Sequence, residues 1–425
     1  MKGYLGGQSM EKIIVSGGNV LNGEVEVEGA KNAALPILAA TILASKGKSD
    51  LSNVPLLSDI YTMKSVLSYL NVDISFDEEN KEMTLDASSK LKEETPFDFM
   101  SKMRASIVVM GPLLARNGYA KVALPGGCAI GTRPIDLHLK GFEAMGVEVH
   151  IEKGYIEASA EQLRGAHIYL DFPSVGATQN IMMAATLAQG TTIIKNAARE
   201  PEVIDLANCL IQMGANIKGA GTDIITIEGV DRLEGATFSV MPDRVEVGTY
   251  LTAVAMTGGL VKIKSAKPQY LSSVILKLEG CGAIINQGED WVEIKMDASR
   301  PQATSLTTGP YPSFPTDMQA QFVSLNSIAK GNSTVTETVF ENRFMHVQEI
   351  ARMGGNITLK GNTAVIEGID KLKGAPVMAT DLRASASLVL AGLVAEGDTT
   401  IDRIYHIDRG YERIEEKLKI LGADI

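Results

Sequence analysis

Stretches in which small and apolar residues fill almost every position recur along the chain. They cover residues 32–45, 104–116, 176–189, 247–257, 317–330 and 382–396. Their spacing of roughly 65 to 75 residues is regular enough to indicate one unit repeated six times. Because a helix with apolar residues on all sides is typical of the interior of a protein, we expect six buried helices.

A short β-rich run and then an amphipathic segment follow each of these stretches. The amphipathic segments end on related phrases, such as GFEAMGVEV at 141–149 and CLIQMGANI at 209–217. Apolar residues three and four apart followed by Gly or Asn predict a helix with a left-handed stop. In the first five copies a β-hairpin follows, for example 147–151 paired with 155–158. The sixth copy reaches Ile425 without its hairpin.

The N-terminal segments 12–15 and 23–27 predict a hairpin that has no helix before it. We expect this hairpin to complete the sixth repeat, so that the chain forms two domains of three repeats each. One domain then comprises residues 1–30 plus 242–425, and the other residues 31–241, with a crossing within 238–244. The predicted fold class is α/β, with buried helices wrapped by sheets and a ligand site in the cleft between the domains.

Length and charge narrow the classes of function. A chain of 425 residues is long enough for two domains, and its net charge of -11 speaks against binding to nucleic acid or a membrane surface. An anionic ligand must therefore meet a local cluster of Arg and Lys. No apolar run reaches the roughly 20 residues of a membrane span. We exclude residues 1–9, as a tag or a native extension, from the fold prediction.

Cysteine and histidine usage points to a reducing compartment and to chemistry without a cofactor. Three widely spaced cysteines form no disulfide framework, and no secretory signal is evident, which favours the cytoplasm. The five histidines lack metal-ligand spacing, so we expect neither a metal nor an organic cofactor. Cys209 and Cys281 lie within the amphipathic phrases and are predicted to be core residues.

Residues 121–134, KVALPGGCAIGTRP, combine a strand-like run, a flexible Pro-Gly-Gly, a thiol and a guanidinium. Cys128 and Arg133 on one loop suggest chemistry on an anion, because a nearby cation lowers the pKa of a thiol. The alternative is a glycine-rich hairpin tip with a small buried cysteine.

Charged residues stand at the start of several small-residue helices. Lys31, Arg104 and Arg383 could form an anion site together with Arg133 and Arg409, because helix N-termini attract anions. Each could instead be a solvated charge at a helix end.

Two acids stand at similar helix starts. Asp317 could deprotonate a hydroxyl or cap its helix, a role that Thr316 could also fill. Asp381 could cap its helix or orient Arg383.

Longer phrases carry a specific resemblance. GAKNAALPILAA, LPGGCAIGTRPIDLH, FPTDMQAQF, TETVFENRFMH, ATDLRASASLVLAG and DRIYHIDRGYER resemble the family of UDP-N-acetylglucosamine 1-carboxyvinyltransferases, within the EPSP synthase superfamily, over residues 12–425. The resemblance implies an inside-out α/β barrel of two domains, each with three β-α-β-α-β-β repeats. It also implies transfer of the enolpyruvyl group of phosphoenolpyruvate to the 3-hydroxyl of UDP-N-acetylglucosamine, with release of phosphate. That reaction is the first committed step of bacterial peptidoglycan synthesis, which supports cell shape and division.

The family pattern assigns roles by position. It implies that Cys128 donates a proton, can add covalently to phosphoenolpyruvate and is alkylated by fosfomycin, while Asp317 deprotonates the hydroxyl. Phosphoenolpyruvate would be held by Lys31, Asn32, Arg133 and Arg409, with Lys31 also catalytic. The nucleotide sugar would be held by Arg104, Arg133, Pro134, Ile135, Asp136, Leu137, Phe172, Pro173, Ser174, Val175, Asp317 and Val339. Supporting positions are Glu200, Asp243, Asp381 and Arg383.

One residue departs from the family pattern, and two other functions stay open. Some members carry lysine where Phe172 stands, so a charge contact to the diphosphate does not transfer to that side chain. The alternatives are a 3-phosphoshikimate 1-carboxyvinyltransferase and an idle paralogue that only binds the nucleotide sugar. For the active enzyme we expect residues 124–136 to close over the cleft when the sugar binds.

Overall fold

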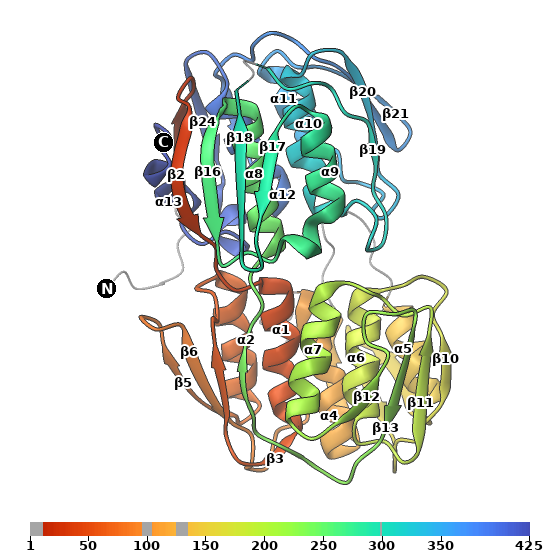
Figure 1. Cartoon of the computed structure of the whole chain (residues 1–425). Coiled ribbons are helices and arrows are strands. Elements are labelled where there is room, and N and C mark those ends of the chain that lie inside the picture. The colour runs from red at the N-terminus through yellow and green to blue at the C-terminus, as the bar shows by residue number, and fades with distance from the viewer. Residues whose placement is uncertain (1–11, 96–103, 125–134, 298–299) are drawn as a thin grey trace.

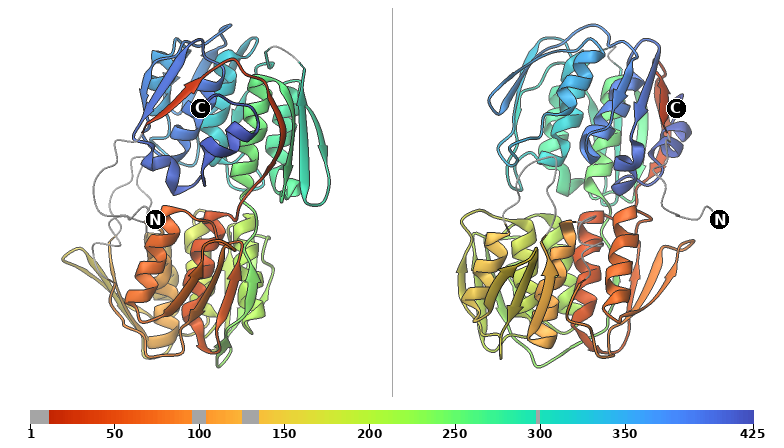
Figure 2. Two further views of the ribbon diagram at one scale, coloured as in Figure 1. Left: turned by 90° about the vertical axis from the view of Figure 1, so that its left-hand side faces the viewer. Right: turned by 180° about the vertical axis from the view of Figure 1, so that it is seen from behind.

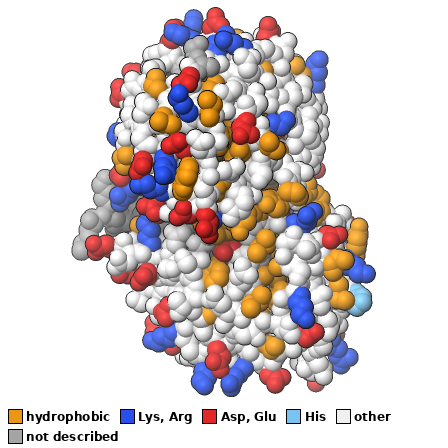
Figure 3. All heavy atoms as spheres, in the orientation of Figure 1, with side chains coloured by type: hydrophobic (Ala, Val, Ile, Leu, Met, Phe, Trp, Pro, Cys, Tyr) orange, Lys and Arg blue, Asp and Glu red, His pale blue; other side chains and the backbone are white. Residues whose placement is uncertain are grey.

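The computed structural model describes residues 12–95, 104–124, 135–297 and 300–425, with the backbone alone at 104–106. The chain forms two lobes stacked end to end (Figure 1), and the visible face of both lobes carries acidic and basic side chains (Figure 3). Each lobe has its own cluster of buried apolar side chains. Lobe one draws its core from residues 30–241, and lobe two from residues 13–27 and 245–423.

The six predicted small-residue helices are confirmed, and they form the interior of the lobes. In α10 every residue from Gln319 to Ile328 is buried. Sheets lie outside these helices (Figure 1), as expected for helices without a polar face. The helices are α1 (Lys31–Ala40), α4 (Met110–Asn117) after the 3₁₀ turn η2 (Arg104–Val109), α6 (Val175–Ala185), α8 (Arg244–Thr257), α10 (Gln319–Ile328) and α12 (Leu382–Leu393).

The amphipathic segments also form helices, and they pack against the buried ones. Helix α7, for example, buries Val203, Leu206 and Leu210. The set comprises α2 (Ser58–Tyr69), α5 (Asp136–Ala144), α7 (Pro201–Gln212), α9 (Ser272–Gly280), α11 (His346–Arg352) and α13 (Ile414–Ile420). None of the described helices is long and apolar enough to cross a membrane.

All five predicted hairpins are present. The hairpin expected at 147–158 places Ile151 opposite Ile156. In the sheets that contain these hairpins, the second hairpin strand pairs antiparallel with a central strand, which in turn contacts a parallel segment from another part of the lobe. The hairpins are β5/β6 (Asp73–Asp77, Glu82–Asp86), β8/β9 (Glu148–Glu152, Tyr155–Ser159), β12/β13 (Asn216–Lys218, Ile224–Glu228), β17/β18 (Ile284–Gln287, Trp291–Met296) and β21/β22 (Asn356–Lys360, Thr363–Glu367).

The parallel segments link neighbouring repeats and close each lobe into a ring. In lobe one, β10 joins the third sheet, and β15 returns to β4 of the first sheet. The central strands are β4 (Ser49–Ser52), β7 (Tyr119–Ala123), β11 (Thr191–Lys195), β16 (Gly259–Lys264), β20 (Asn332–Thr336) and β24 (Asp398–Asp402), and the parallel strands are β2 (Leu21–Glu26), β10 (His167–Tyr169), β15 (Thr237–Ser239), β19 (Leu306–Thr307) and β23 (Pro376–Met378). This architecture is the inside-out α/β fold predicted from the sequence.

The predicted N-terminal hairpin is wrong, because its two strands pair in different sheets. Strand β1 (Ile13–Ser16) pairs antiparallel with β24, as β13 pairs with β11, and Ser16 bridges to Asp424. Strand β2 instead pairs in parallel with β16 of the fourth repeat. Figure 2 shows the red N-terminal strands beside blue and green elements of lobe two. The N-terminal segment thus supplies both the strand that the sixth repeat lacks and the strand that closes the ring.

Two neighbouring segments connect the lobes. The amide of Ala30 donates to the carbonyl oxygen of Met241 at 2.7 Å, and the amide of Asp243 donates to the carbonyl oxygen of Glu28 at 2.8 Å. A Cβ on Gly29 would lie only 1.9 Å from the carbonyl oxygen of Asn53, so this crossing needs glycine. Helices α1 and α8 begin directly after these crossings, which places their N-termini at the interface between the lobes.

Candidate functional site

One carboxylate at the lobe interface binds two cations. Lys31, the first residue of α1, is 8% exposed, and its Nζ lies 3.2 Å from Oδ2 of Asp59. Arg409 ends the 3₁₀ turn η5 (Ile404–Arg409) in lobe two, and its Nε donates to Oδ1 of Asp59 at 3.0 Å. Its Nη2 donates to Oδ2 at 3.3 Å. Asp59 of lobe one therefore holds one cation from each lobe.

The electrostatics around Lys31 favour an anionic ligand. Burial lowers the pKa of the Lys31 ammonium, Asp59 opposes that shift, and Arg383 and Arg409 lower the pKa further. A bound anion would stabilise the charged form of all three cations, so the site is suited to a ligand with more than one negative charge.

A second carboxylate lies between two arginines of lobe two. Asp317, in the 3₁₀ turn η4 (Thr316–Met318), accepts from Nη2 of Arg343 at 2.8 Å and from Nη2 of Arg383 at 3.2 Å. The residues that precede η4 and α10, Pro315 and Met318, make no side-chain cap, and the hydroxyl of Thr316 donates to Glu337. With a quarter of its side chain exposed, Asp317 can reach a ligand hydroxyl.

Two further acids at this interface do cap helices. Asp381 accepts the backbone amides of Arg383 and Ala384 at the start of α12. Asp243 accepts those of Val245 and Glu246 at the start of α8, and burial raises its carboxyl pKa. These caps fix the helix ends that carry the cluster.

Arg383 pairs with Asp317 and also acts on Lys31, whose pKa it lowers. Its side chain is 3% exposed and lies over the ring of Tyr411, 5.4 Å from the centroid. Its Nη1 is buried and has no hydrogen-bond partner among the described residues. A buried guanidinium donor without a partner is costly, and a bound anion would satisfy it.

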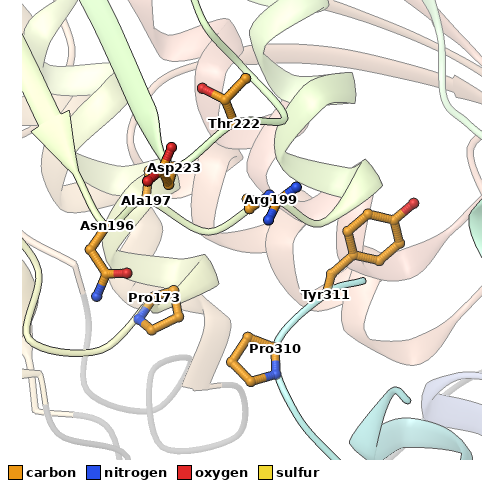
Figure 4. Close-up of a pocket in the computed structure, with 8 residues that line it drawn as sticks. All are labelled: Pro173, Asn196, Ala197, Arg199, Thr222, Asp223, Pro310 and Tyr311. Atoms are coloured by element: carbon orange, nitrogen blue, oxygen red, sulfur yellow. The ribbon is translucent and has the colours of Figure 1, made fainter. Parts of the chain in front are cut away.

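A pocket of about 450 Å³ opens between the lobes. Pro173, Asn196 and Arg199 line it from lobe one, and Pro310 and Tyr311 line it from lobe two (Figure 4). Its volume is in the range of sites for small organic ligands.

An acid of lobe one holds the segment of lobe two that lines this pocket. Oε1 of Glu200 accepts the backbone amide of Tyr311 at 3.2 Å. Its Oε2 is buried with no hydrogen-bond partner in the described ranges, and burial raises the pKa of this carboxyl.

Some of the residues assigned to the nucleotide sugar also lie near this interface. Pro173 lines the pocket, and Ser174 caps α6 by accepting the amide of Ala177 at 3.2 Å. Glu337 accepts the amide of Val339 and, at its other oxygen, the hydroxyl of Thr316, which brings Val339 toward Asp317. The remaining assigned residues whose side chains are described, Asn32, Ile135, Asp136, Leu137, Phe172 and Val175, are exposed or partly exposed.

Part of the predicted site lies outside the described residues. Cys128, Arg133 and Pro134 fall in 125–134, and only the backbone is described at Arg104. Cys209 and Cys281 are buried, as predicted for core residues, and burial raises the pKa of each thiol to about 12. Across the described ranges, no group of three or more His, Cys, Asp or Glu residues is placed to hold a metal ion.

Three residues of this cluster were not predicted from the sequence: Asp59, Arg343 and Glu337. Asp59 had a usable signal, because α5 and α7 also carry an acid in the first turn of the amphipathic helix. Arg343 and Glu337 lie in the quoted phrase TETVFENRFMH, but their role depends on contacts with Thr316 and Asp317 that are distant in sequence.

Comparisons with known proteins agree with this architecture. The model of the EPSP synthase family, 3-phosphoshikimate 1-carboxyvinyltransferase, matches residues 15–418. The crystal structure of the enolpyruvyl transferase NikO from Streptomyces tendae superposes with a TM-score of 0.88 at 24% identity, covering 97% of this chain and 98% of that one. EPSP synthase from Acinetobacter baumannii has a TM-score of 0.70 at 19% identity, with 91% and 93% covered. At these identities the structural likeness shows a shared fold.

Proposed function

This chain belongs to the EPSP synthase family, and we propose that it transfers the enolpyruvyl group of phosphoenolpyruvate to the 3-hydroxyl of UDP-N-acetylglucosamine. The observation that supports this most is the interface cluster, in which Lys31 and Arg409 share the carboxylate of Asp59, and Arg383 pairs with the partly exposed carboxylate of Asp317. A dianionic donor and a hydroxyl acceptor need those two features side by side.

In this proposal the donor is held by the cations. Phosphoenolpyruvate carries a phosphate and a carboxylate, and guanidinium and ammonium groups bind both through charge-assisted hydrogen bonds. Lys31 and Arg409 are already brought together by Asp59, and Nη1 of Arg383 offers a further donor. Arg133 and Asn32 stay in the donor set on the family pattern alone.

The acceptor is activated by Asp317. Its carboxylate, oriented by Arg343 and Arg383, takes the proton of the 3-hydroxyl as that oxygen bonds to C2 of phosphoenolpyruvate. Cys128 gives a proton to C3, which produces a tetrahedral ketal. Loss of a proton from C3 then restores the double bond while the bond from C2 to the phosphate oxygen breaks and phosphate leaves.

Sequence phrases favour the nucleotide sugar as acceptor over shikimate 3-phosphate. The PGGC loop and the KNAALP opening are typical of the UDP-N-acetylglucosamine enzymes. The pocket that Pro173 lines at the interface between the lobes has room for part of a nucleotide sugar. We therefore also propose a role in peptidoglycan synthesis in a bacterial cytoplasm, and fosfomycin as an inhibitor that alkylates Cys128.

Phosphate release tests the proposed reaction. Purified protein with phosphoenolpyruvate should release phosphate on addition of UDP-N-acetylglucosamine and not on addition of shikimate 3-phosphate. The reverse preference would identify a 3-phosphoshikimate 1-carboxyvinyltransferase, and release with neither acceptor would favour the idle paralogue. Full resistance to fosfomycin with normal turnover would contradict the assignment of Cys128.

A further inference from the structure

We propose that Asp59 is a positioning residue of this site, whose carboxylate holds Lys31 of lobe one and Arg409 of lobe two in a single arrangement that the donor requires. The identity of the donor as phosphoenolpyruvate rests on the proposed function. Asp59 itself is not expected to touch the reacting atoms. Its effect would pass through the two cations that it orders.

The geometry of Asp59 fits this role. Both of its oxygens are used, since Oδ1 accepts from Nε of Arg409 and Oδ2 accepts from Lys31 and from Nη2 of Arg409. The carboxylate is 5% exposed and stands in the first turn of α2, where the helix dipole stabilises a negative charge. A buried acid that contacts two cations from different lobes fixes their separation more tightly than either side chain could alone.

Lys31 depends on this carboxylate electrostatically. An ammonium at the first residue of α1 faces the positive end of the helix dipole. Among the described residues, the charged groups that act on it most are Asp59 on α2, Arg383 on α12 and Arg409 on η5, and of these three Asp59 alone is an acid. Without Asp59, the ammonium would be buried among like charges and would lose its proton at a lower pH.

The same carboxylate connects the two halves of the site. Arg409 reaches Asp59 across the interface, so this contact forms only when the lobes are close together. Asp59 therefore holds one cation from each lobe in a single arrangement at the interface, where Arg383 of lobe two also pairs with Asp317.

The test uses Asp59→Asn in the full-length protein, because asparagine keeps the shape and removes the charge. We expect KM for phosphoenolpyruvate to rise about 10-fold to 100-fold, while KM for UDP-N-acetylglucosamine changes less than about 3-fold. The pH at which KM for phosphoenolpyruvate begins to rise should fall, because Lys31 loses the charge that raises its pKa. If turnover is too slow to measure, a calorimetric titration with phosphoenolpyruvate gives the same comparison as Kd.

Glu202→Gln is the matched control. Glu202 is another buried acid of lobe one, and it pairs across the interface with Arg244 at 2.8 Å without contacting Lys31. This variant should lose an ion pair between the lobes yet keep the affinity for phosphoenolpyruvate and its pH profile. Asp59→Glu, which keeps the charge but displaces it, should raise KM and retain the wild-type pH profile, and it serves where Asp59→Asn fails to fold.

Unchanged KM and pH profile in Asp59→Asn would overturn the proposal, as would a pH shift in Asp59→Glu equal to that of Asp59→Asn. A KM increase of the same size in Glu202→Gln would also overturn it, because loosening of the interface would then explain the effect. Failure of the proposed function looks different, since the wild-type protein would then release no phosphate with UDP-N-acetylglucosamine.

Discussion

The two lobes share one repeated unit but present different chemistry at their common interface. In lobe two the buried helices begin next to Asp243, Asp317 and the pair Asp381 and Arg383. In lobe one, α1 begins with Lys31, and α6 begins at the neutral cap Ser174. At the starts of these buried helices, the same frame thus supplies acids and an arginine from lobe two and a lysine from lobe one. A site of this kind is complete only when both lobes contribute.

The lobes also differ in how their rings close. Lobe one is closed by β15 from its own continuous chain, whereas lobe two needs β1 and β2 from the N-terminal segment. The positions are nevertheless filled in the same way, with an antiparallel strand beside β24 and a parallel strand beside β16. The packed repeat, and not the continuity of the chain, defines each lobe.

The largest effect is expected for Asp317, the partly exposed acid that lobe two contributes to the site. Asp317→Asn should lower kcat about 10²-fold to 10⁴-fold, because the amide cannot take the hydroxyl proton. The measurement is phosphate release at saturating substrates, with thermal unfolding to confirm the fold. Asp370→Asn, which removes a carboxylate paired with Arg300 on the surface of lobe two, should leave kcat within about 2-fold. An equal decrease in kcat in both variants would contradict the role of Asp317 as the base.

A pH series tests whether the two lobes titrate alike. Each lobe buries a neutral histidine, and burial lowers the pKa of His138 in lobe one and of His346 in lobe two to about 4. For His346, Asp381 opposes the effect of burial and Arg343 adds to it. A histidine with a depressed folded-state pKa contributes stability above the unfolded pKa of about 6.5, which is lost as the pH falls toward 4.

The expected loss is about 3 kcal/mol for each histidine between pH 6.5 and 4, measured as the free energy of unfolding in urea. His138→Gln and His346→Gln should each remove one histidine's contribution to the change in the free energy of unfolding with pH. Nδ1 of His138 is paired with the side-chain amide of Asn180, whereas Nε2 of His346 lacks a hydrogen-bond partner among the described residues. A dependence unchanged in both variants would contradict the assignment.

A core substitution tests whether the N-terminal segment belongs to lobe two. Val15 on β1 is fully buried, so Val15→Ala should lower the free energy of unfolding by about 1.5–3 kcal/mol. Hydrogen exchange should increase in lobe two and stay unchanged in lobe one. Ile227→Ala on β13, the equivalent strand of lobe one, should give the opposite pattern. Faster hydrogen exchange in lobe one after the Val15 substitution would contradict the assignment of β1 to lobe two.

The smallest effect is expected at an ion pair that connects the lobes. Lys81 of lobe one contacts Glu412 of lobe two at 2.8 Å and Glu28 on the connecting segment at 2.5 Å. Lys81→Met should cost at most about 1 kcal/mol in the free energy of unfolding, because this pair is partly exposed to water. Lys121→Met removes a similar pair within lobe one alone, with Glu94 and Glu157.

Only the Lys81 variant should raise KM for both substrates, by about 2-fold, and the difference should shrink at high salt because salt screens exposed charges. Steady-state rates at low and high salt provide the measurement. The same change in KM after Lys121→Met would show that contact between the lobes is not involved.

The sequence predicted local structure well because the pattern of each repeat is local. The helix at 319–328 and the hairpin at 148–159 follow from periodicity and turn residues that lie within a few positions of each other. The N-terminal hairpin failed for the opposite reason. Strands β1 and β2 are close in sequence, yet their partners β24 and β16 are set by closure of the ring, which no local pattern encodes.

The residues of the candidate site also fall into those that a local pattern predicts and those that depend on distant contacts. Charged residues at equivalent helix starts led to Lys31, Asp317 and Arg383, and the structure brings these side chains together. The acid at the start of α2 repeats at the starts of α5 and α7, but the pairing of Asp59 with Lys31 and of Arg343 with Asp317 depends on contacts made across the fold. The roles assigned to Cys128 and Arg133 stay predictions from the family pattern.

The placement of β1 and β2 has a consequence for synthesis on the ribosome. These strands emerge first, but β16 and β24 follow more than two hundred and three hundred residues later. At about 5–20 residues per second, β2 waits roughly 10 to 50 s for its partner, while lobe one can fold in the meantime. During that interval two unpaired strands are exposed to other chains, which can pair with them. A chaperone that covers β1 and β2 would prevent such pairing until the rest of lobe two has been synthesised.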